Sequence, residues 1–247
     1  MATKVIAHRG GAFLNVENSR DAFENSIQLG VDFIECDVHS SVDDETFVLH
    51  DATLDRTTEA QGPVRLQCAT NLSRLRLRGA RGECIPRLSD VVALLPRAGS
   101  GLQIEIKTDS SGQPYPGILE RSLACLDAAD RRSRCGIIAF HAPTAAAAEA
   151  AGGLDHVAWL FGPAMLRELG AAGVVGVARA HGLRAVETHA DVLDTELVRV
   201  LREARLGIAV WGANHADSAA RMLALGVDMM ASDDAATALR VRAEAGR

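Results

Sequence analysis

The sequence alternates short apolar runs with stretches of helical spacing from one end to the other. This alternation limits the possible folds more than any other feature of the chain. The apolar runs are continuous, which is typical of strands buried on both faces of a parallel sheet. Helices are predicted between them, for example at Ser19–Leu29 and Thr195–Ala204. Eight strands are predicted: Lys4–Ala7, Phe33–Val38, Leu102–Ile106, Gly136–Phe140, Val157–Phe161, Arg184–Thr188, Ile208–Trp211 and Asp228–Ala231.

Eight strand–helix units in 247 residues are typical of a (β/α)8 TIM barrel. A doubly wound open sheet shows the same alternation and is the alternative fold. Barrels of this kind commonly fill about 250 residues as one unit, so residues 1–247 are expected to form a single catalytic domain. A glycine stands before several predicted strands, where it could end the preceding helix: Gly30, Gly182, Gly207 and Gly226.

One segment interrupts this rhythm. An insertion at about residues 40–88 separates the second predicted strand from a helix near Ser89–Leu95, whereas such a connection usually takes about 2 to 6 residues. The insertion contains an apolar run of its own, Thr46–Leu49, and a basic stretch from Arg74 to Arg81. Long insertions after barrel strands lie on the face that carries the active site, so this one is expected to shape the site.

Charge and cysteine content exclude several kinds of partner. With 32 acidic and 26 basic residues, the chain has no bulk attraction for nucleic acid or for an anionic membrane. The apolar run Val5–Ala7 is too short for a signal peptide, and no run reaches the ~18 residues of a transmembrane helix. Five scattered cysteines without a C-x-x-C pair are typical of free thiols. We therefore expect a cytoplasmic protein that begins at Met1 and binds a small molecule.

Three acidic residues are predicted to meet inside the barrel. Glu35 and Asp37 lie two residues apart on the second predicted strand and so share a face, and Glu105 lies on the third. Three carboxylates cannot all be ionised in a confined site without a cation, and a set of oxygen ligands suits Mg²⁺ or Ca²⁺ better than zinc. We predict that they bind one divalent cation. Pairing of each acid with a surface Lys or Arg is the alternative.

Two histidines are candidates for proton transfer. His8 follows the first predicted strand, and His50 lies in the insertion. Histidine titrates near neutral pH, so a pair can act as base and acid in one displacement, although a lone histidine is more often structural. Arg9 and Lys107 stand beside these groups and would suit an anionic substrate such as a phosphate. Which histidine would be the acid stays open.

Other polar residues close the later strands. His141 follows the fourth predicted strand, and Glu187 and His189 stand two residues apart at the end of the sixth. They could line a substrate pocket or form structural hydrogen bonds, and both interpretations stay open.

An ordered set of short motifs covers nearly the whole chain. Together these motifs resemble those of the glycerophosphodiester phosphodiesterase family. Its members are phosphatidylinositol-phosphodiesterase-like TIM barrels. The motifs are His8-Arg9-Gly10, Glu17-Asn18-Ser19, Ile34–Val38, His50-Asp51, Leu54–Thr58, Ile85–Leu88, Ile104–Lys107, Val210-Trp211, Asn214, Leu225–Asp228 and Ser232-Asp233.

The resemblance implies a TIM barrel with a small insertion after strand two and a reaction in lipid and glycerol metabolism. Glycerophosphodiesters, the deacylated phospholipids, would be hydrolysed to an alcohol and glycerol 3-phosphate. Water could attack directly, or the substrate's own hydroxyl could first form a cyclic phosphate. The implied roles are general acid–base catalysis by His8 and His50, metal binding by Glu35, Asp37 and Glu105, and substrate binding by Arg9, Glu17, Lys107 and Trp211.

Three alternatives to this function differ in the residues they require. A non-catalytic barrel that binds a phosphorylated ligand would not require both histidines and the full acidic set. A related phosphodiesterase or lyase could act on another phosphodiester. An aldolase-like barrel would need a Schiff-base lysine, and Lys107, one of only two lysines, has acidic neighbours that would keep it protonated. Gly-rich nucleotide-binding motifs are absent from the sequence.

Overall fold

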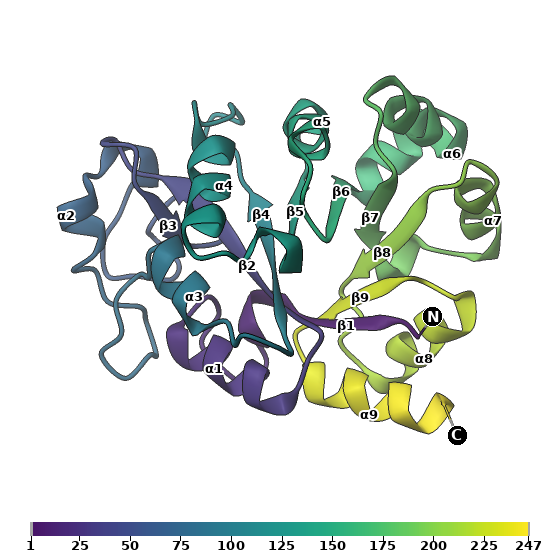
Figure 1. The fold of residues 1–247 in the computed structure, drawn as a ribbon, viewed down its shortest axis with the longest axis horizontal. Helices are drawn as coiled ribbons and strands as arrows, with labels where there is room; N and C mark the ends of the chain where they lie inside the picture. Colours follow the sequence, from purple (N-terminus) through teal and green to yellow (C-terminus); the bar gives the residue numbers. More distant parts are fainter. Residues whose placement is uncertain (1, 247) are drawn as a thin grey trace.

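The computed structural model describes residues 2–246 and contains the predicted barrel (Figure 1). Eight parallel strands form a closed ring, because β1 pairs with β9 on one side and with β2 on the other. This closure excludes the open sheet. The predicted strand ends differ from the observed ones by at most two residues. The ring contains β1 (Lys4–Ala7), β2 (Phe33–Ser40), β4 (Gly101–Ile106), β5 (Cys135–Ala139), β6 (His156–Phe161), β7 (Ala185–His189), β8 (Gly207–Trp211) and β9 (Met229–Ser232).

Helices surround the ring and bury their apolar faces against the outside of the strands. The Ser19 hydroxyl caps the first helix by accepting a backbone N–H, and Gly30 ends it with a φ of 78°, both as predicted. The prediction for Gly207 is wrong: it is the first residue of β8, and the left-handed turn before it is made by Arg205, with a φ of 61°. The helices are α1 (Arg20–Leu29), α3 (Leu88–Leu94), α4 (Ile118–Ala128), α5 (Ala142–Ala151), α6 (Pro163–Ala180), α7 (Thr195–Glu203), α8 (Ala216–Leu225) and α9 (Ala235–Ala245).

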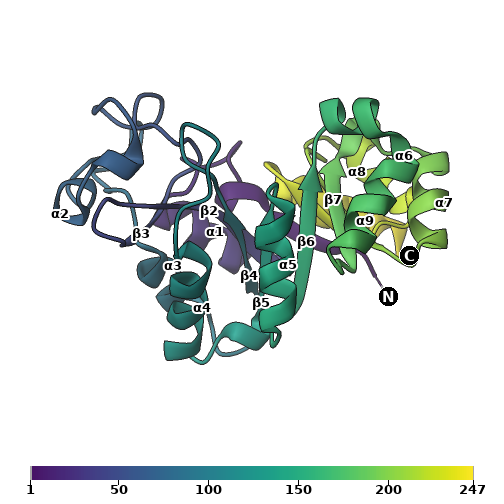
Figure 2. The ribbon, with the colours of Figure 1, turned by 90° about the horizontal axis from the view of Figure 1, so that it is seen from above.

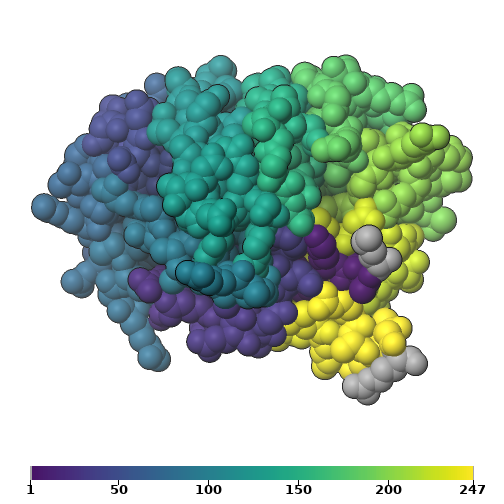
Figure 3. Space-filling view, in the orientation of Figure 1, coloured from purple at the N-terminus to yellow at the C-terminus, as the bar shows by residue number. Residues whose placement is uncertain are grey.

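The insertion between β2 and α3 forms a small layer of its own. It contains β3 (Thr46–Val48), which pairs antiparallel with the end of β2, and the short helix α2 (Ala69–Leu72). Figures 1 and 2 place α2 at one end of the molecule and α6 and α7 at the other, and in Figure 3 the insertion (blue) continues directly into the barrel surface. A separate cluster of buried side chains stabilises it: Phe47, Leu49, Leu54, Val64, Ala69, Leu72, Leu77 and Ile85.

The inside of the barrel is partly polar. Alternate residues of each strand face inward, so β2 contributes Glu35 and Asp37, while β4 contributes Gln103 and Glu105; all four are buried. Apolar side chains fill the remaining interior in two small clusters. This polar interior on two adjacent strands positions the site described below.

Two further expectations concern the chain as a whole. All five cysteines are free, as predicted. Within residues 2–246, no helix combines the length and the apolar character that crossing a bilayer requires.

Candidate active site

A cavity of about 110 Å³ opens at the carboxyl ends of the strands. Two predicted site residues are not among those that line it. Asp37 is fully buried and pairs with Lys107, which lines the cavity. Glu17 accepts from the guanidinium of Arg9, another lining residue, at 3.2 Å. The expectation that Glu17 lines the pocket is therefore wrong. The other predicted site residues line the cavity together: His8, Arg9, Glu35, His50, Glu105, Lys107 and Trp211.

His8 is presented by a tight turn that follows β1. Arg9 and Gly10 both have positive φ, at 50° and 78°, and a Cβ on Gly10 would lie 2.7 Å from a side chain of α1. The turn therefore requires glycine. His8 Nδ1 lies 2.7 Å from Asp233 Oδ1, and the other oxygen of Asp233 accepts from Asn214 Nδ2 at 2.6 Å. These hydrogen bonds fix the plane of the His8 ring. Within the described residues, Nε2 has no hydrogen-bond partner, and His8 lines the cavity.

His50 is brought to the cavity by the insertion, just beyond β3. Its Nδ1 lies 2.7 Å from Asp51 Oδ1. The backbone oxygen of His50 lies 3.1 Å from His39 Nε2. Arg56 donates to Asp51 at 2.7 Å and to both oxygens of Glu17 at 2.7 Å. Both histidines therefore have Nδ1 occupied by a carboxylate, which is the arrangement that orients an imidazole for proton transfer through Nε2.

Glu35, Asp37 and Glu105 form a cluster, and two of them line the same cavity as the two histidines. Each offers an oxygen within 4.8 Å of the others, and they are only 1%, 0% and 7% exposed. Lys107 Nζ lies 2.7 Å from Glu105 and 2.9 Å from Asp37. Within the described residues, Glu35 Oε1 is buried without a hydrogen-bond partner, while Oε2 accepts from the Arg9 backbone N–H at 2.8 Å. An unpaired buried oxygen in an all-carboxylate set suits one hard divalent cation, which this cluster could hold.

Comparison with known proteins relates this site to a family. The sequence model of the glycerophosphoryl diester phosphodiesterase family matches residues 8–237, which include every predicted site residue. The chain belongs to this family. A glycerophosphodiester phosphodiesterase of Caldanaerobacter subterraneus subsp. tengcongensis is 35% identical over 146 residues, which are 57% of this chain and 59% of the relative. The chain spans about half to three fifths of the length of this relative and of two Bacillus relatives.

Solved structures from the same family share the fold. A crystal structure from Agrobacterium tumefaciens strain C58, assigned to the glycerophosphoryl diester phosphodiesterases, is 25% identical with a TM-score of 0.95, and the match covers 100% of this chain and 99% of that one. A phosphodiesterase of Oleispira antarctica, solved in complex with its product sn-glycerol-3-phosphate, is 21% identical with a TM-score of 0.77 over 97% and 96% of the two chains.

Burial sets the protonation of the acidic cluster in this family member. It raises the pKa of Glu35 well above its usual range, and the nearby charges of Asp37 and Glu105 add to this effect. Burial also raises the pKa of Glu105, against the opposing charge of Lys107. For Asp37 burial acts in the same direction, but Lys107, His50 and Arg9 together outweigh it and lower the pKa. Burial therefore opposes the charged forms of Glu35 and Glu105, and a bound cation would offset this cost.

The histidines differ in their surroundings. Burial lowers the pKa of His50, although Asp37 opposes the effect, so the ring is neutral at neutral pH and can accept a proton. Burial opposes ionisation of Asp233, but the hydrogen bond from His8 outweighs it and lowers the Asp233 pKa. Asp233 is therefore a carboxylate that accepts a hydrogen bond at His8 Nδ1 and orients the ring.

The sequence predicts no role for the groups that orient the two histidines. Asp51 follows His50 directly, which was a usable signal. Asp233 directly follows the last strand, the kind of position where polar residues already suggested a site on other strands. Neither its distance from His8 nor its link to Asn214 could be read from the chain.

Of the three residues left open, only Glu187 lines the cavity. The ring of His141 lies 2.9 Å from the Thr144 hydroxyl at the start of α5. His189 accepts a backbone N–H at 3.2 Å, and its ring centroid lies 5.9 Å from that of Trp211. Both histidines therefore contact other protein groups, whereas Glu187 lines the cavity.

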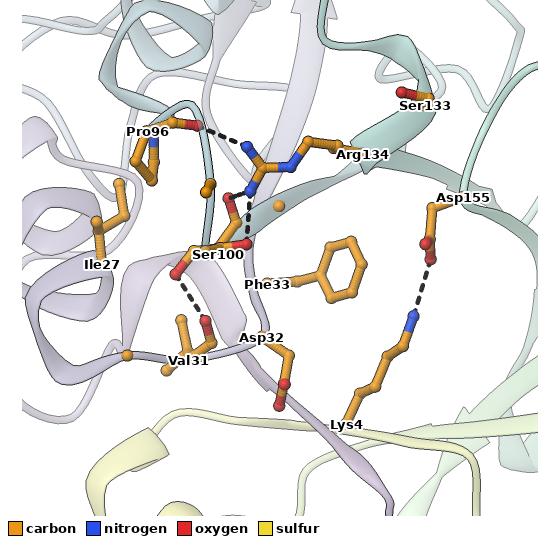
Figure 4. A pocket seen from close by; sticks show the side chains of 14 residues that line it. Lys4, Ile27, Val31, Asp32, Phe33, Pro96, Ser100, Ser133, Arg134 and Asp155 are labelled. Carbon is orange, nitrogen blue, oxygen red and sulfur yellow. Dashed lines mark hydrogen bonds and ion pairs between the residues drawn. The ribbon is translucent and has the colours of Figure 1, made fainter. Parts of the chain in front are cut away.

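A larger cavity of about 590 Å³ lies at the opposite, amino-terminal ends of the strands (Figure 4). Its charged groups are paired with one another or with the backbone. Lys4 forms an ion pair with Asp155 at 3.0 Å, and Arg134 donates to the carbonyl oxygens of Pro96 at 2.7 Å and Ser100 at 3.0 Å. These contacts stabilise the base of the barrel, and the described residues that line this cavity include no histidine.

Proposed function

We propose that this protein hydrolyses glycerophosphodiesters to an alcohol and glycerol 3-phosphate, with one divalent cation and two histidines as acid and base. The observation that carries the proposal is the arrangement of His8 and His50 around one cavity, each with Nδ1 held by a carboxylate at 2.7 Å. A barrel that only bound phosphate would gain nothing from orienting two imidazoles. Family membership and the product complex of the Oleispira phosphodiesterase support the same reaction.

The cationic side chains favour a phosphodiester anion. Lys107 lies against two carboxylates, where burial lowers its pKa but the charges of Asp37 and Glu105 more than reverse this, so it stays protonated. Arg9 forms ion pairs with Glu17 at 3.2 Å and with Asp37 at 3.6 Å. Both groups are thereby fixed at the cavity and can bind the phosphoryl oxygens without losing much conformational freedom.

Proton transfer is assigned to the histidines. One imidazole accepts a proton from the attacking hydroxyl group, and the other donates a proton to the leaving alkoxide. His50 is the better candidate for the base because burial lowers its pKa, and His8, oriented by Asp233, is then the candidate acid. A cation held by Glu35, Asp37 and Glu105 would supply neutralisation of charge on the phosphoryl oxygens.

A panel of glycerophosphodiesters with different alcohols tests the reaction, with glycerol 3-phosphate release as the assay. We expect release that is lost on adding a chelator and restored by Mg²⁺ or Ca²⁺. The variant His8→Asn, purified in the same way, controls for contaminating activity. No release from any diester would contradict the proposed function, and accumulation of a cyclic phosphate detected by ³¹P NMR would favour a lyase-type first step.

Cation binding can be tested apart from turnover. Glu35→Gln is expected to weaken binding of Mg²⁺ or Ca²⁺ at least tenfold in calorimetric titrations while circular dichroism shows an intact fold, because a neutral amide is a poorer ligand than a carboxylate. The exposed Glu120→Gln is the matched control. Unchanged affinity in Glu35→Gln would remove Glu35 from the metal site.

A further inference from the structure

A hydrogen-bonded pair crosses the interior of the barrel, and one member, Gln103, is the ladder neighbour of Glu35 in the acidic cluster. TIM-barrel interiors are usually filled by branched apolar side chains, but here Gln103 is 0% exposed and Glu187 is 2% exposed. They lie on β4 and β7, which are not neighbours in the ring, and Gln103 Nε2 donates to Glu187 Oε2 at 3.3 Å. Burying these groups costs free energy that only hydrogen bonds or a ligand can offset.

The orientation of Gln103 is fixed from its other side. Its Oε1 accepts from His156 Nε2 at 2.7 Å, and His156 Nδ1 lies 3.0 Å from Asp155. Gly136 leaves room for this ring, since a Cβ there would lie 2.2 Å from the His156 ring atoms. The amide group of Gln103 is thereby directed at Glu187 and holds one of its oxygens in place.

The second oxygen of Glu187 has no protein partner. Within the described part of the chain, Oε1 makes no hydrogen bond, and the ladder neighbours of Glu187 are the apolar Leu160 and Ala209. Because Glu187 lines the cavity, a partner for Oε1 must come from the cavity itself. Burial, reinforced by the charge of Glu105, raises the pKa of Glu187 to about 8, so a neutral carboxyl group, able to donate as well as accept, faces the cavity at neutral pH.

We infer that Glu187, held by Gln103, binds a hydroxyl group of the substrate's glycerol portion and selects for it. The inference rests on the proposed function. The cavity volume of about 110 Å³ corresponds to roughly four water molecules, which suits a small polyol and not a bulky headgroup. Ile138 and Leu160 line the same cavity and restrict it further. The glycerol phosphate end is common to all substrates of the class, whereas the leaving alcohol varies in size and extends through the open mouth.

Binding of two phosphate monoesters tests the inference without the chemical step. The protein is titrated calorimetrically, in the presence of Mg²⁺, with glycerol 3-phosphate and with propyl phosphate, which lacks the hydroxyl groups. Wild type is expected to bind glycerol 3-phosphate about tenfold more tightly, the effect of one well-made hydrogen bond. Glu187→Leu is expected to bring the two dissociation constants within about threefold of each other, mainly by weakening the binding of glycerol 3-phosphate. Glu187→Gln is expected to retain the preference, because an amide still donates and accepts hydrogen bonds.

Each outcome decides the matter. Equal affinities in wild type would overturn the inference even if Glu187→Leu failed to fold, and so would a Glu187→Leu protein that kept the preference or lost affinity for both monoesters equally. The matched control variants at the exposed Glu120, Glu120→Gln and Glu120→Leu, should show the same two dissociation constants as wild type. A wild-type protein that releases glycerol 3-phosphate from diesters but shows no preference refutes the role of Glu187 alone. One that releases none and binds neither monoester refutes the proposed function, and this inference with it.

Discussion

Replacing Glu187 by glutamine should make the stability of this protein less dependent on pH. The pKa of the Glu187 carboxyl group rises from 4.5 to about 8 in the folded protein, mainly because of burial. The neutral form is therefore favoured on folding. This contribution is complete below pH 4.5 and is lost as the pH rises through about 8, because the folded state then holds a charge that burial disfavours. Glutamine has nearly the same shape and never ionises.

The size of the effect follows from the pKa rise. Each pH unit between 4.5 and about 8 corresponds to about 1.4 kcal/mol, which sets an upper limit of roughly 5 kcal/mol. Relaxation around a buried charge reduces this limit, so we expect a difference of about 2 to 4 kcal/mol at pH 9 and less than about 1 kcal/mol at pH 5. A difference of that size is a large part of the ~5 to 15 kcal/mol that stabilise a typical domain.

Urea unfolding of wild type and Glu187→Gln at several pH values between 5 and 9, with a chelator present, measures this difference. The free energy of unfolding of Glu187→Gln should exceed that of wild type by an amount that grows with pH. Glu120→Gln, a substitution on the exposed surface of α4, should show a constant difference from wild type. A difference for Glu187→Gln that stays the same from pH 5 to pH 9 would refute the argument that burial of Glu187 favours its neutral form.

Two substitutions address the acid–base pair. His8→Asn and His50→Asn should each lower kcat by roughly 10² to 10⁴ with a much smaller effect on KM, because proton transfer matters only in the transition state. Near-normal turnover in both variants would show that other groups transfer the protons. Asp233→Asn removes the carboxylate beside His8 and should lower kcat by roughly 10- to 10³-fold without unfolding the protein, whereas Asp234→Asn, which keeps a capping side chain on α9, should be nearly silent. Equal activity in the two variants would exclude a positioning role for Asp233.

Much of the barrel could be predicted because its rules are local. A strand buried on both faces needs a continuous apolar run, and such runs located all eight barrel strands within two residues. The two-residue period of a strand placed Glu35 and Asp37 on one face, and the structure groups them with Glu105. The helix ends were less predictable, since Gly207 and Arg205 could both have supplied the turn before β8.

The function of individual polar residues was harder to predict. The sequence showed that His141, Glu187 and His189 follow strands, but a histidine near a strand end can equally bind a substrate or its own neighbours. Only packing distinguishes these cases, and it directs Glu187 alone into the cavity. The position of Glu17 shows the same limit, because its contacts with Arg9 and Arg56 depend on how the insertion packs against the first helix.

By itself, the sequence determined the number of barrel strands, the face on which the acids lie and the presence of an insertion, because these follow from periodicities of a few residues. The tertiary structure decided which groups meet. Closure of the ring brings Asp233 from the last strand to His8 after the first, and the insertion's own core carries His50 to the same cavity. Gln103 and Glu187 meet only because their strands face each other across the barrel. Such contacts join residues far apart in the chain, and their partners are set by global packing and not by local propensity.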